Sequence, residues 1–417
     1  MRKFLLLALC ALGSAAVTYA GGYRVSLQGQ RALAMGHTGV AVVNSAELGF
    51  FNPSGLVYLE NRLNLSVGAS AVFSDVVYQN DQFGQLHRAD SPVGTPFYLY
   101  ASYKMNDWLA LGLSVYTPYG STVVWEDDWA GSHLVNNIDL QAVYIQPVAS
   151  IKLSDMFSVG GGPIYVTGGV NFNRNLNRTL TDIDGNRTNV TVDATGVSAW
   201  GWSGSMMFSP SEKFRLGFNY RSEIILEAED GAAEFSNVPN SPLTPFKNTS
   251  FNAALPLPAE VSVGLSYQFH KKWLFALDVN QTLWSVYDSL DIDFADPSIP
   301  DSENPRNYKD SSIYRFGFQY DASTLFTLRA GYYYDESPVQ EGYFAPETPR
   351  NDSQGFTGGL SLNLSDNFTI DASFLYIRFA ETNASYNHYM ENGVAVPFSG
   401  TYKSSAFVPG LGMTYKL

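Results

Sequence analysis

Apolar and polar residues alternate along most of this chain with a period of two. In residues 63–73 the odd positions are apolar, from Leu63 to Phe73, and the even positions from Asn64 to Ser70 are polar or glycine. Because successive side chains of a strand point to opposite faces, such a segment has one apolar and one polar wall. Many such segments, separated alternately by short and long gaps, are typical of a transmembrane β-barrel.

Fourteen alternating segments can be counted from residue 63 onward, an even number, as in bacterial barrels built from one chain. Short gaps such as 105–107 and 322–323 have the length and composition of tight turns, and we expect them to face the periplasm. Long gaps such as 228–258 and 287–310 are expected to face outward. The predicted strands are 63–73, 97–104, 108–117, 140–152, 157–170, 196–208, 214–227, 259–269, 273–286, 311–321, 324–335, 355–364, 367–379 and 402–417.

The start of the chain reads as a secretory signal over residues 1–20. Arg2 and Lys3 precede a short apolar run, and Thr18-Tyr19-Ala20 resembles a cleavage site, so we expect the mature protein to begin at Gly21. The single cysteine, Cys10, lies inside the signal. The mature chain therefore has no cysteine for a disulfide or a thiolate metal site.

Residues 21–62 do not alternate. Asn52-Pro53 predicts a helix start, because Asn caps free backbone N–H groups and Pro suits the first turn, and Asn44 with Glu47 predicts another. The segment is too short for a core of its own. We therefore expect a small helical hatch, or plug, inside the lumen of a barrel formed by residues 63–417. The alternative is a disordered periplasmic leader.

Composition narrows the class of protein. The chain has 26 Tyr, 27 Phe and 7 Trp, many near strand ends, where barrels place aromatic girdles. Its formal net charge of −14 argues against a nucleic-acid partner. No later stretch approaches 18 consecutive apolar residues, so no membrane helix is predicted. A large secreted soluble β-protein is the alternative to an all-β, 14-stranded antiparallel transmembrane barrel of a Gram-negative outer membrane.

Catalytic and metal chemistry find little support. No Gly-x-Ser-x-Gly motif stands beside any of the histidines, so we predict no enzyme and no cofactor. Asp182-Ile183-Asp184-Gly185-Asn186 hints at a calcium loop but lacks the distal Glu, and an Asx turn is the better interpretation. No metal site is predicted. The histidines are His37, His87, His133, His270 and His388.

Short motifs in order along the chain make it similar to the FadL/TodX family of outer-membrane transporters for hydrophobic molecules. They extend from residue 21 to the C-terminus, and their order and spacing carry the resemblance. The motifs are Gly21-Gly22-Tyr23-Arg24-Val25, Phe51-Asn52-Pro53-Ser54-Gly55-Leu56 with Ser54 for the usual Ala, Tyr220-Arg221-Ser222-Glu223, Leu257-Pro258-Ala259-Glu260, Lys309-Asp310 and Leu328-Arg329-Ala330-Gly331.

The resemblance implies a monomeric fourteen-stranded barrel closed by an N-terminal hatch. It implies capture of a ligand by apolar surface on the outer loops, a tighter site in the lumen beside the hatch, and opening by a shift of the N-terminal residues. Exit is then sideways into the membrane, through a gap at a kink in the third strand. The implied hatch and gating residues are Gly21, Asn52, Pro53 and Gly55.

A fatty-acid ligand would need a cation for its carboxylate in a low-dielectric lumen. Lys309 and Arg174 match family positions near the ligand site, and Arg329 is a third candidate. The alternative for each is a pair with a luminal carboxylate, or a place among lipopolysaccharide phosphates.

A lateral gap needs an interrupted strand, and proline or glycine interrupts a ladder. Candidates are Pro118 and Gly120 in the third strand and Gly161 and Pro163 in the fifth; the alternative for the glycine-rich run is a bulge without a gap. A transporter of hydrophobic molecules also needs apolar side chains in its lumen. We expect these at Tyr98, Tyr100, Trp200, Trp202, Met206, Phe208, Phe326 and Leu328, unless the register of the two faces is reversed.

The function predicted is uptake of long-chain fatty acids or similar hydrophobic molecules by ligand capture, hatch rearrangement and lateral diffusion. Expected partners are the ligand, outer-membrane lipid, lipopolysaccharide and the barrel-assembly machinery, which the apolar alternation ending at Leu417 would serve. The first alternative is uptake of aromatic hydrocarbons by the same fold. A fatty acid predicts a cation at the luminal site, and a neutral aromatic predicts an all-apolar pocket. A general porin or a surface adhesin is the further alternative.

Overall fold

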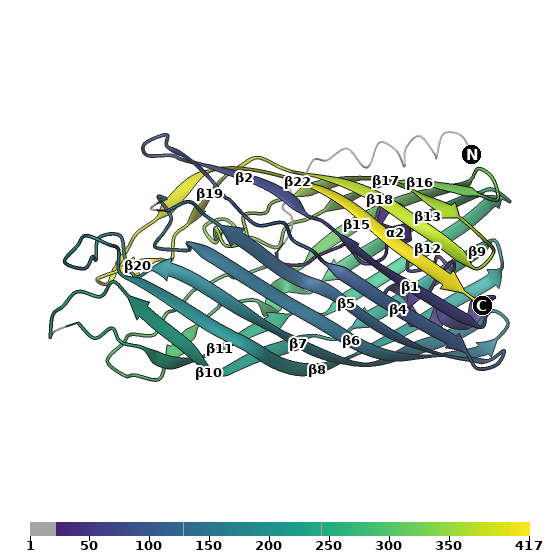
Figure 1. Cartoon of the computed structure of the whole chain (residues 1–417), viewed down its shortest axis with the longest axis horizontal. Coiled ribbons are helices and arrows are strands. Elements are labelled where there is room, and N and C mark those ends of the chain that lie inside the picture. The colour runs from purple at the N-terminus through teal and green to yellow at the C-terminus, as the bar shows by residue number, and fades with distance from the viewer. Residues whose placement is uncertain (1–21, 128, 243) are drawn as a thin grey trace, which may run out of the picture.

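The chain forms a closed antiparallel barrel of fourteen strands, shown lengthwise in Figure 1. The computed structural model describes residues 22–417 except 128 and 243, so the predicted signal, residues 1–20, and Gly21 lie outside the described residues. β1 (Leu63–Ser70) pairs with both β4 (Phe97–Lys104) and β22 (Phe398–Lys416), which closes the wall. No helix in the described part of the chain is long and apolar enough to cross a membrane.

Each of the fourteen predicted segments overlaps one wall strand, which confirms the predicted fold. Between β4 and β22 the wall strands follow in chain order. They are β5 (Leu109–Val124), β6 (Asn137–Ser154), β7 (Phe157–Asn175), β8 (Asn189–Ser211), β9 (Phe214–Arg221), β12 (Glu260–His270), β13 (Trp273–Thr282), β15 (Ser311–Asp321), β16 (Phe326–Asp335), β17 (Ser353–Asn363) and β18 (Phe368–Phe379).

The long connections build further strands above the barrel, where the sequence predicted loops. β2 (Phe73–Asn80) continues along β22 and pairs with β3 (Leu86–Arg88), and β10 (Ile224–Ser236) forms a hairpin with β11 (Thr249–Leu257). These lie at the end opposite the C-terminus and the short turns (Figure 1). The smaller elements there are η2 (Trp284–Val286), β14 (Ile292–Phe294), β19 (Thr382–Tyr386), β20 (Met390–Glu391) and β21 (Val394–Ala395).

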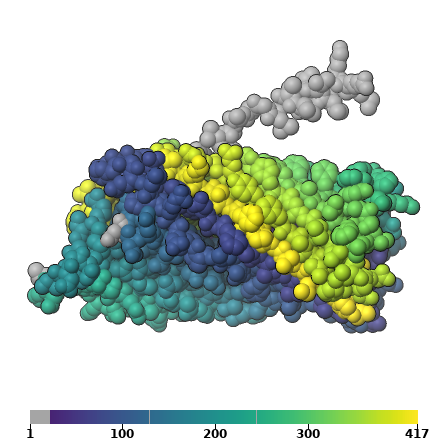
Figure 2. All heavy atoms as spheres, turned by 45° about the horizontal axis from the view of Figure 1, so that its top comes forward, coloured from purple at the N-terminus to yellow at the C-terminus, as the bar shows by residue number. Residues whose placement is uncertain are grey.

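The outer face of the wall is apolar and the inner face carries small polar side chains. Leu65 and Val67 of β1 are exposed toward the surroundings of the barrel, whereas Asn64 and Ser66 are buried in its interior. Figure 2 shows β22, in yellow, running obliquely across this outer face beside the blue strands from the first part of the chain. Such an apolar exterior suits contact with lipid.

The prediction of luminal aromatic residues is confirmed for two positions and wrong for the others. Tyr98 and Tyr100 point inward, with exposed fractions of 2% and 1%. Trp200 and Trp202 point outward, with exposed fractions of 68% and 54%. Alternation alone shows that a strand has two faces but not which of them meets lipid. The other outward-facing residues are Met206, Phe208, Phe326 and Leu328.

Residues 22–62 occupy the lumen, and we call them the hatch. They contain α2 (Gln30–Leu33), α3 (Leu48–Phe51) and the 3₁₀ helix η1 (Pro53–Tyr58). α2 contacts β17, β18 and β22, while η1 contacts β4 to β8, so the hatch touches both sides of the barrel. Most hatch side chains are buried, as the apolar residues of this segment require.

The predicted helix start at Asn52 is present, but the predicted cap is wrong. Asn52 precedes Pro53 of η1 and makes no side-chain capping bond. Its Nδ2 donates instead to the carbonyl oxygens of Val40 at 2.8 Å and Met206 at 3.1 Å. A buried amide takes the strongest set of partners that its surroundings offer, and here the wall and the hatch backbone supply them.

The second predicted helix start lay at Asn44 with Glu47, whereas α3 begins at Leu48 with Glu47 as the residue before it, and the Glu47 side chain serves another helix. Its two carboxylate oxygens accept hydrogen bonds from the backbone N–H groups of Arg31 at 3.2 Å and Ala32 at 3.1 Å. These are free donors in the first turn of α2. Burial, followed by repulsion from Asp371, raises the pKa of Glu47 to about 7. The carboxyl group thus joins the two helical parts of the hatch.

Candidate functional site

The lower part of the hatch is anchored to the wall by uncharged hydrogen bonds. The carbonyl oxygen of Ser54 accepts hydrogen bonds from Ser150 Oγ at 2.8 Å and Ser158 Oγ at 2.7 Å. The backbone N–H of Ser54 donates to Ser205 Oγ at 2.9 Å. Glycine 160 leaves the space for this contact, since a Cβ there would lie 2.6 Å from the Ser54 nitrogen. We call residues 52–59 the hatch base.

The first described residues run along β5 and form a strap, which we define as residues 22–26. Val25 N–H donates to the carbonyl oxygen of Pro118 at 2.8 Å, and Gly120 N–H donates to that of Tyr23 at 3.0 Å. Arg24 and Tyr119 thereby form an antiparallel bridge. The strap therefore pairs with β5 from inside the barrel, as an added strand would.

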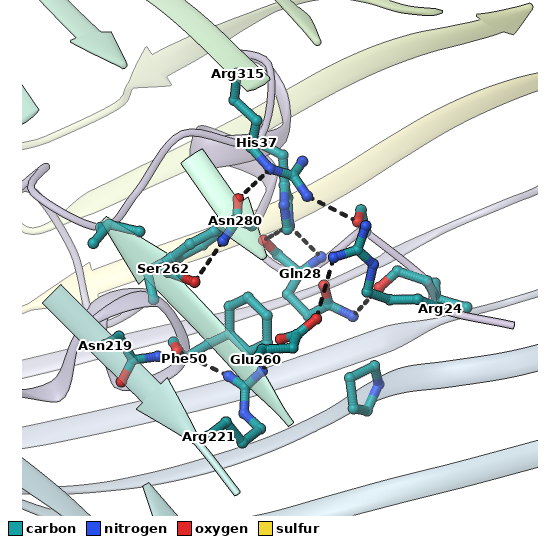
Figure 3. Close-up of a pocket in the computed structure, with 15 residues that line it drawn as sticks. Arg24, Gln28, His37, Phe50, Asn219, Arg221, Glu260, Ser262, Asn280 and Arg315 are labelled. Atoms are coloured by element: carbon teal, nitrogen blue, oxygen red, sulfur yellow. Dashed lines mark hydrogen bonds and ion pairs between the residues drawn. The ribbon is translucent and has the colours of Figure 1, made fainter. Parts of the chain in front are cut away.

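Buried charges tie the strap to the opposite wall (Figure 3). Arg24 Nη1 lies 3.3 Å from Glu260 Oε1, and Arg24 Nη2 lies 3.3 Å from Asp335 Oδ1. Glu260 is shared, because its other oxygen lies 2.6 Å from Arg221 Nη1. A cavity of about 30 Å³ beside these groups is lined by apolar side chains such as Phe50 and by charged ones such as Arg315. It is a charged joint between hatch and wall.

An apolar pocket lies beyond the strap, toward the outer end of the lumen. Its volume is about 60 Å³, and we call it the luminal pocket. The charged group among its lining residues is Glu347, whose carboxylate is paired with Arg306. The apolar lining residues include Tyr23, Ile138, Leu140, Val170, Ala194, Val197, Leu226, Ala228, Phe251, Leu255, Tyr287 and Leu290.

The wall is interrupted where the strap meets β5. The β5–β6 ladder shifts register between Tyr116 and Tyr119, and the pairing of β4 with β5 ends at Tyr116. A recess of about 410 Å³ occupies this place, and we call it the wall recess. It shares Ser121 and Leu140 with the luminal pocket. The other lining residues include Val25, Val72, Pro92, Val93, Phe97, Thr117, Gly120, Thr122, Val143 and Arg350.

The four predicted kink residues fall at two different irregularities. Pro118 and Gly120 stand at the register shift of β5, beside the recess. Gly161 has φ +148°, and opposite Pro163 the β6–β7 pairs stop at Tyr165 and resume at Gly161 without a change of register. A recess therefore accompanies the irregularity of the third strand, whereas the fifth strand keeps its register with β6 at Gly161 and Pro163.

The three predicted cations lie apart from one another. Arg174 Nη2 donates to Ser302 Oγ at 2.9 Å, above the barrel, and Lys309 is exposed. Arg329 is buried lower in the wall, where its Nε donates to Gln319 at 2.9 Å and Nη1 donates to Ser361. None of the three lines the luminal pocket. The predicted hatch residues Asn52, Pro53 and Gly55 lie together in the buried hatch base.

The sequence did not single out Arg350, which lies nearer the pockets. It lines the wall recess and the neighbouring cavity under β22, and its Nη1 faces the carbonyl oxygens of Gly22 at 3.4 Å and Arg24 at 3.3 Å. Among the described residues no carboxylate lies within ion-pair distance of it. Burial lowers the pKa of Arg350. Such a cation can accept an anionic ligand group.

Arg24, Glu260 and Asp335 were also missed as a charged joint. Arg24 and Glu260 stand within motifs quoted for the family resemblance, but no spacing brings together residues 236 positions apart. In the part of the chain that the structure covers, no group of three His, Cys, Asp or Glu side chains gathers as a metal site would.

Comparison with known proteins assigns this architecture. The sequence model of the family described as "Outer membrane protein transport protein (OMPP1/FadL/TodX)" matches residues 11–417. The chain is 23% identical to the long-chain fatty acid transport protein of Escherichia coli O6:H1, over 85% of this chain and 87% of that protein. The crystal structure of a Pseudomonas aeruginosa FadL homologue matches with a TM-score of 0.81 and 18% identity, over 95% of this chain and 100% of the other.

A second solved structure is of a protein named for the transport of a different molecule. The P. putida toluene transporter TodX matches with a TM-score of 0.71 and 15% identity, over 95% of this chain and 99% of the other. At such identities the structures show a shared fold, and the ligand has to be argued from the site itself.

Proposed function

Because the chain belongs to the OMPP1/FadL/TodX family of outer-membrane transport proteins, we propose that it takes up long-chain fatty acids or similar hydrophobic molecules through the luminal pocket and the wall recess. The family is one of transport channels for hydrophobic compounds, not of enzymes, and the chain is a protein of the Gram-negative outer membrane. The route within this chain and its ligand are the proposal.

The observation that carries the proposal is the apolar lining of the luminal pocket. Ordinary porins line their lumen with polar side chains, because water and hydrophilic solutes pass through it. Here aliphatic and aromatic side chains surround a cavity directly above the strap, with Tyr23 of the hatch as one wall. An apolar molecule loses its unfavourable contact with water when it enters such a pocket.

We propose that displacement of the strap releases the ligand from the luminal pocket. Ser121 and Leu140 line both the luminal pocket and the wall recess, so the two spaces meet at these residues. Val25 of the strap lines the recess and is hydrogen-bonded to Pro118. Displacement of the strap from β5 would join the spaces and free the edge of β5, and the ligand would leave sideways. We propose that the division into a hatch over 21–62 and a barrel over 63–417 serves this movement.

The residues of the hatch base have a different proposed role. Asn52, Pro53 and Gly55 keep the base in place while the strap moves, because their contacts with the wall are numerous and buried. A cyclic Pro53 also limits the backbone of η1. Gly21, the remaining predicted gating residue, lies outside the described residues. Insertion by the barrel-assembly machinery, contact with lipopolysaccharide and a monomeric state stay predictions of the sequence.

The ligand class depends on the cation. We propose that Arg350 receives the carboxylate of a fatty acid at the recess while the alkyl chain occupies apolar surface. Lys309 and Arg174 would meet the carboxylate earlier, near the outer end, and Arg329 is proposed as a contact on the lower side. The absence of Lys and Arg from the described lining of the luminal pocket favours the alternative, a neutral aromatic hydrocarbon.

Equilibrium binding decides between the two ligands. The mature protein is purified in a detergent that does not resemble a fatty acid and is titrated with radiolabelled oleate, with toluene as competitor. The variants are Arg350→Ala and the double change Lys309→Ala/Arg174→Ala. Arg378→Ala, which removes an exposed arginine from β18, is the matched control.

Three results are distinguishable. Saturable oleate binding that weakens about tenfold in Arg350→Ala and not in Arg378→Ala supports the fatty-acid proposal, since a charged hydrogen bond contributes roughly 1.5–3 kcal/mol. Toluene binding without dependence on any cation moves the protein to aromatic uptake. Binding of neither, together with ion conductance in a planar bilayer, contradicts the proposal and leaves a porin.

A further inference from the structure

A second interruption of the wall lies between β8 and β10, far along the chain from the recess at β5. Lower down, β8 pairs with β9 up to Ser203 and Arg221. Higher up, β8 pairs with β10 only from Asp193 and Ala232 onward. Between these points the described residues form no ladder, apart from the two bonds that join Trp202 with Ser222. We call this stretch the seam.

Backbone irregularities stand on both sides of the seam. Gly196 of β8 has φ +73° and is skipped by the register of the β7–β8 ladder. Asp230 of β10 has φ +54° and lies in a register shift of the β10–β11 hairpin. Bulges of this kind redirect a strand and end its pairing. The seam is therefore a built interruption and not a frayed strand end.

The β10–β11 hairpin is attached to the barrel above and below the seam but not along it. It joins β9 and β12 through residues 222–223 and 258–259, β10 pairs with β8 over Ala232–Ser236, and β11 pairs with β14 over Phe251–Ala253. Side chains close the seam, in a cluster that includes Val192, Ala194, Ala228 and Phe251. Apolar contacts without backbone hydrogen bonds can separate without leaving unpaired polar groups.

The luminal pocket borders the seam directly. Ala194 and Val197 line the pocket from β8, while Leu226 and Ala228 line it from β10. At its other end the pocket reaches Ser121, which also lines the wall recess. The seam, the pocket and the recess thus follow one another across the barrel.

The residues on the outer face of the seam indicate its position relative to the membrane. β10 carries exposed carboxylates beside the seam, and ionised carboxylates are costly in the hydrocarbon layer. Trp200 and Trp202 stand at its lower end and contact the rings of Tyr165 and Tyr220, as in an interfacial girdle. The seam therefore opens above the acyl chains, in the polar outer layer. The carboxylates are Glu223, Glu227, Glu229, Asp230 and Glu234.

We propose that the seam is a side entrance through which hydrophobic molecules in the polar layer of the outer leaflet reach the luminal pocket. The part of β10 between its two paired ends moves outward, the ligand passes between Val197 and Ala228, and the apolar cluster closes behind it. This inference rests on the proposed function, because it needs a ligand that occupies the pocket. It adds an entry point separate from the exit at β5.

Cross-linking of the seam tests the entrance without changing the pocket. Ser198 of β8 and Glu227 of β10 face outward on its two sides. The variant Ser198→Cys/Glu227→Cys is joined with a short bifunctional maleimide, which is selective because the mature chain has no cysteine of its own. The matched control is Thr191→Cys/Glu234→Cys, across a position where β8 and β10 are already paired. Radiolabelled oleate and toluene are the probes.

The expected result is kinetic. Joining the seam slows association and dissociation of the probe together, by about tenfold or more, and leaves the Kd unchanged, while the cross-linked control behaves as the wild type. An unchanged association rate, or a change in Kd alone, overturns the entrance while the proposed function stands. Failure of the wild type to bind either probe overturns both.

Discussion

The hatch base and the strap belong to one short segment, yet they are attached to the barrel in different ways. The base, residues 52–59, is fixed by uncharged hydrogen bonds to serines of three neighbouring strands and by an apolar cluster that includes Leu56 and Met207. The strap, residues 22–26, is attached by two ion pairs of Arg24 and by backbone pairing with an irregular stretch of β5.

The difference indicates which part moves. Separating the base from the wall would leave several buried backbone groups without partners in an enclosed space, which is costly. The strap lies beside the luminal pocket and the wall recess, where a ligand or water can replace what it gives up. We therefore expect the base to remain in place while the strap is displaced.

The largest effect on ion conductance is expected where the base meets the wall. In Gly160→Val the new Cβ lies 2.6 Å from the nitrogen and 2.7 Å from the Cα of Ser54, neither of which is a flexible side-chain end. Overpacking of this kind costs roughly 1–3 kcal/mol or more. We predict that the base is pushed out of the lumen and that ion conductance in planar bilayers rises severalfold.

A matched control is Gly204→Ala, whose Cβ meets nothing closer than Trp202 at 3.5 Å. It should keep the conductance of the wild type. A Gly160→Val barrel with normal conductance and thermal stability would show that the base is not a fitted plug.

The next effect concerns the charges of the strap. Arg24→Ala leaves Glu260 with Arg221 and removes the ion-pair partner of Asp335 among the described residues. Breaking a buried ion pair costs about 3–5 kcal/mol. We predict faster hydrogen exchange at the amides of Val25 and Gly120, with exchange in the base unchanged. Equal loss of protection in strap and base would contradict their independence, and Arg62→Ala, an exposed change at the end of the hatch, should alter neither.

The stability of the hatch is expected to depend on pH through Glu47, which lies between the strap and the base in the sequence. Burial raises its pKa to about 7 in the folded protein, above its ordinary value near 4.5. Below pH 4.5 the group is protonated in both the folded and the unfolded protein, and its full contribution to folding stability is present. This contribution, on the order of 3 kcal/mol, is lost as the pH rises through 7, because the folded protein then holds a buried charge. We predict that thermal stability of the hatch declines over this range, and that Glu47→Gln removes the decline. Glu60→Gln, at an exposed hatch position, should keep it.

The smallest effect is expected for the amide of the base. Asn52→Ala removes two donated hydrogen bonds, to Val40 and Met206. Each buried carbonyl left without its partner costs about 1 kcal/mol, so unfolding by denaturant should be easier by roughly 1–2 kcal/mol. Asn52→Asp, which keeps the size but turns a carboxylate oxygen toward both carbonyl oxygens, should show a larger loss. A neutral result for both variants would mean that the wall does not depend on this amide.

Period-two alternation predicted every wall strand, because the pattern reports a sheet with two unlike faces. It did not assign the faces, and Trp200 and Trp202 were placed inside when they lie outside. In soluble proteins an apolar face is buried in a core, whereas in this barrel the larger apolar residues meet lipid and small polar ones such as Ser150 meet the hatch.

The hatch was predicted from its lack of alternation and its apolar residues, but its contacts were not. The partners of Asn52 and Arg24 are separated from them by 154 and 236 positions, and only the closed barrel brings them together. For the same reason the sequence could nominate Lys309, Arg174 and Arg329 but could not show that Arg350 lies closest to the recess.

Fixing the strap in its present position tests the central claim most directly. Val25 lies near Gly120, with its methyl 3.8 Å from a Cβ placed on Gly120, so the thiols of Val25→Cys/Gly120→Cys come near each other, and mass spectrometry of the oxidised protein checks that they join. Ser54→Cys/Ser205→Cys fixes the base in the same manner. Uptake of radiolabelled oleate by cells is compared under oxidising and reducing conditions. The account predicts that oxidation stops uptake with the strap fixed, reversibly, and leaves it unchanged with the base fixed. Undiminished uptake with a fixed strap, or loss of uptake only with a fixed base, would contradict it.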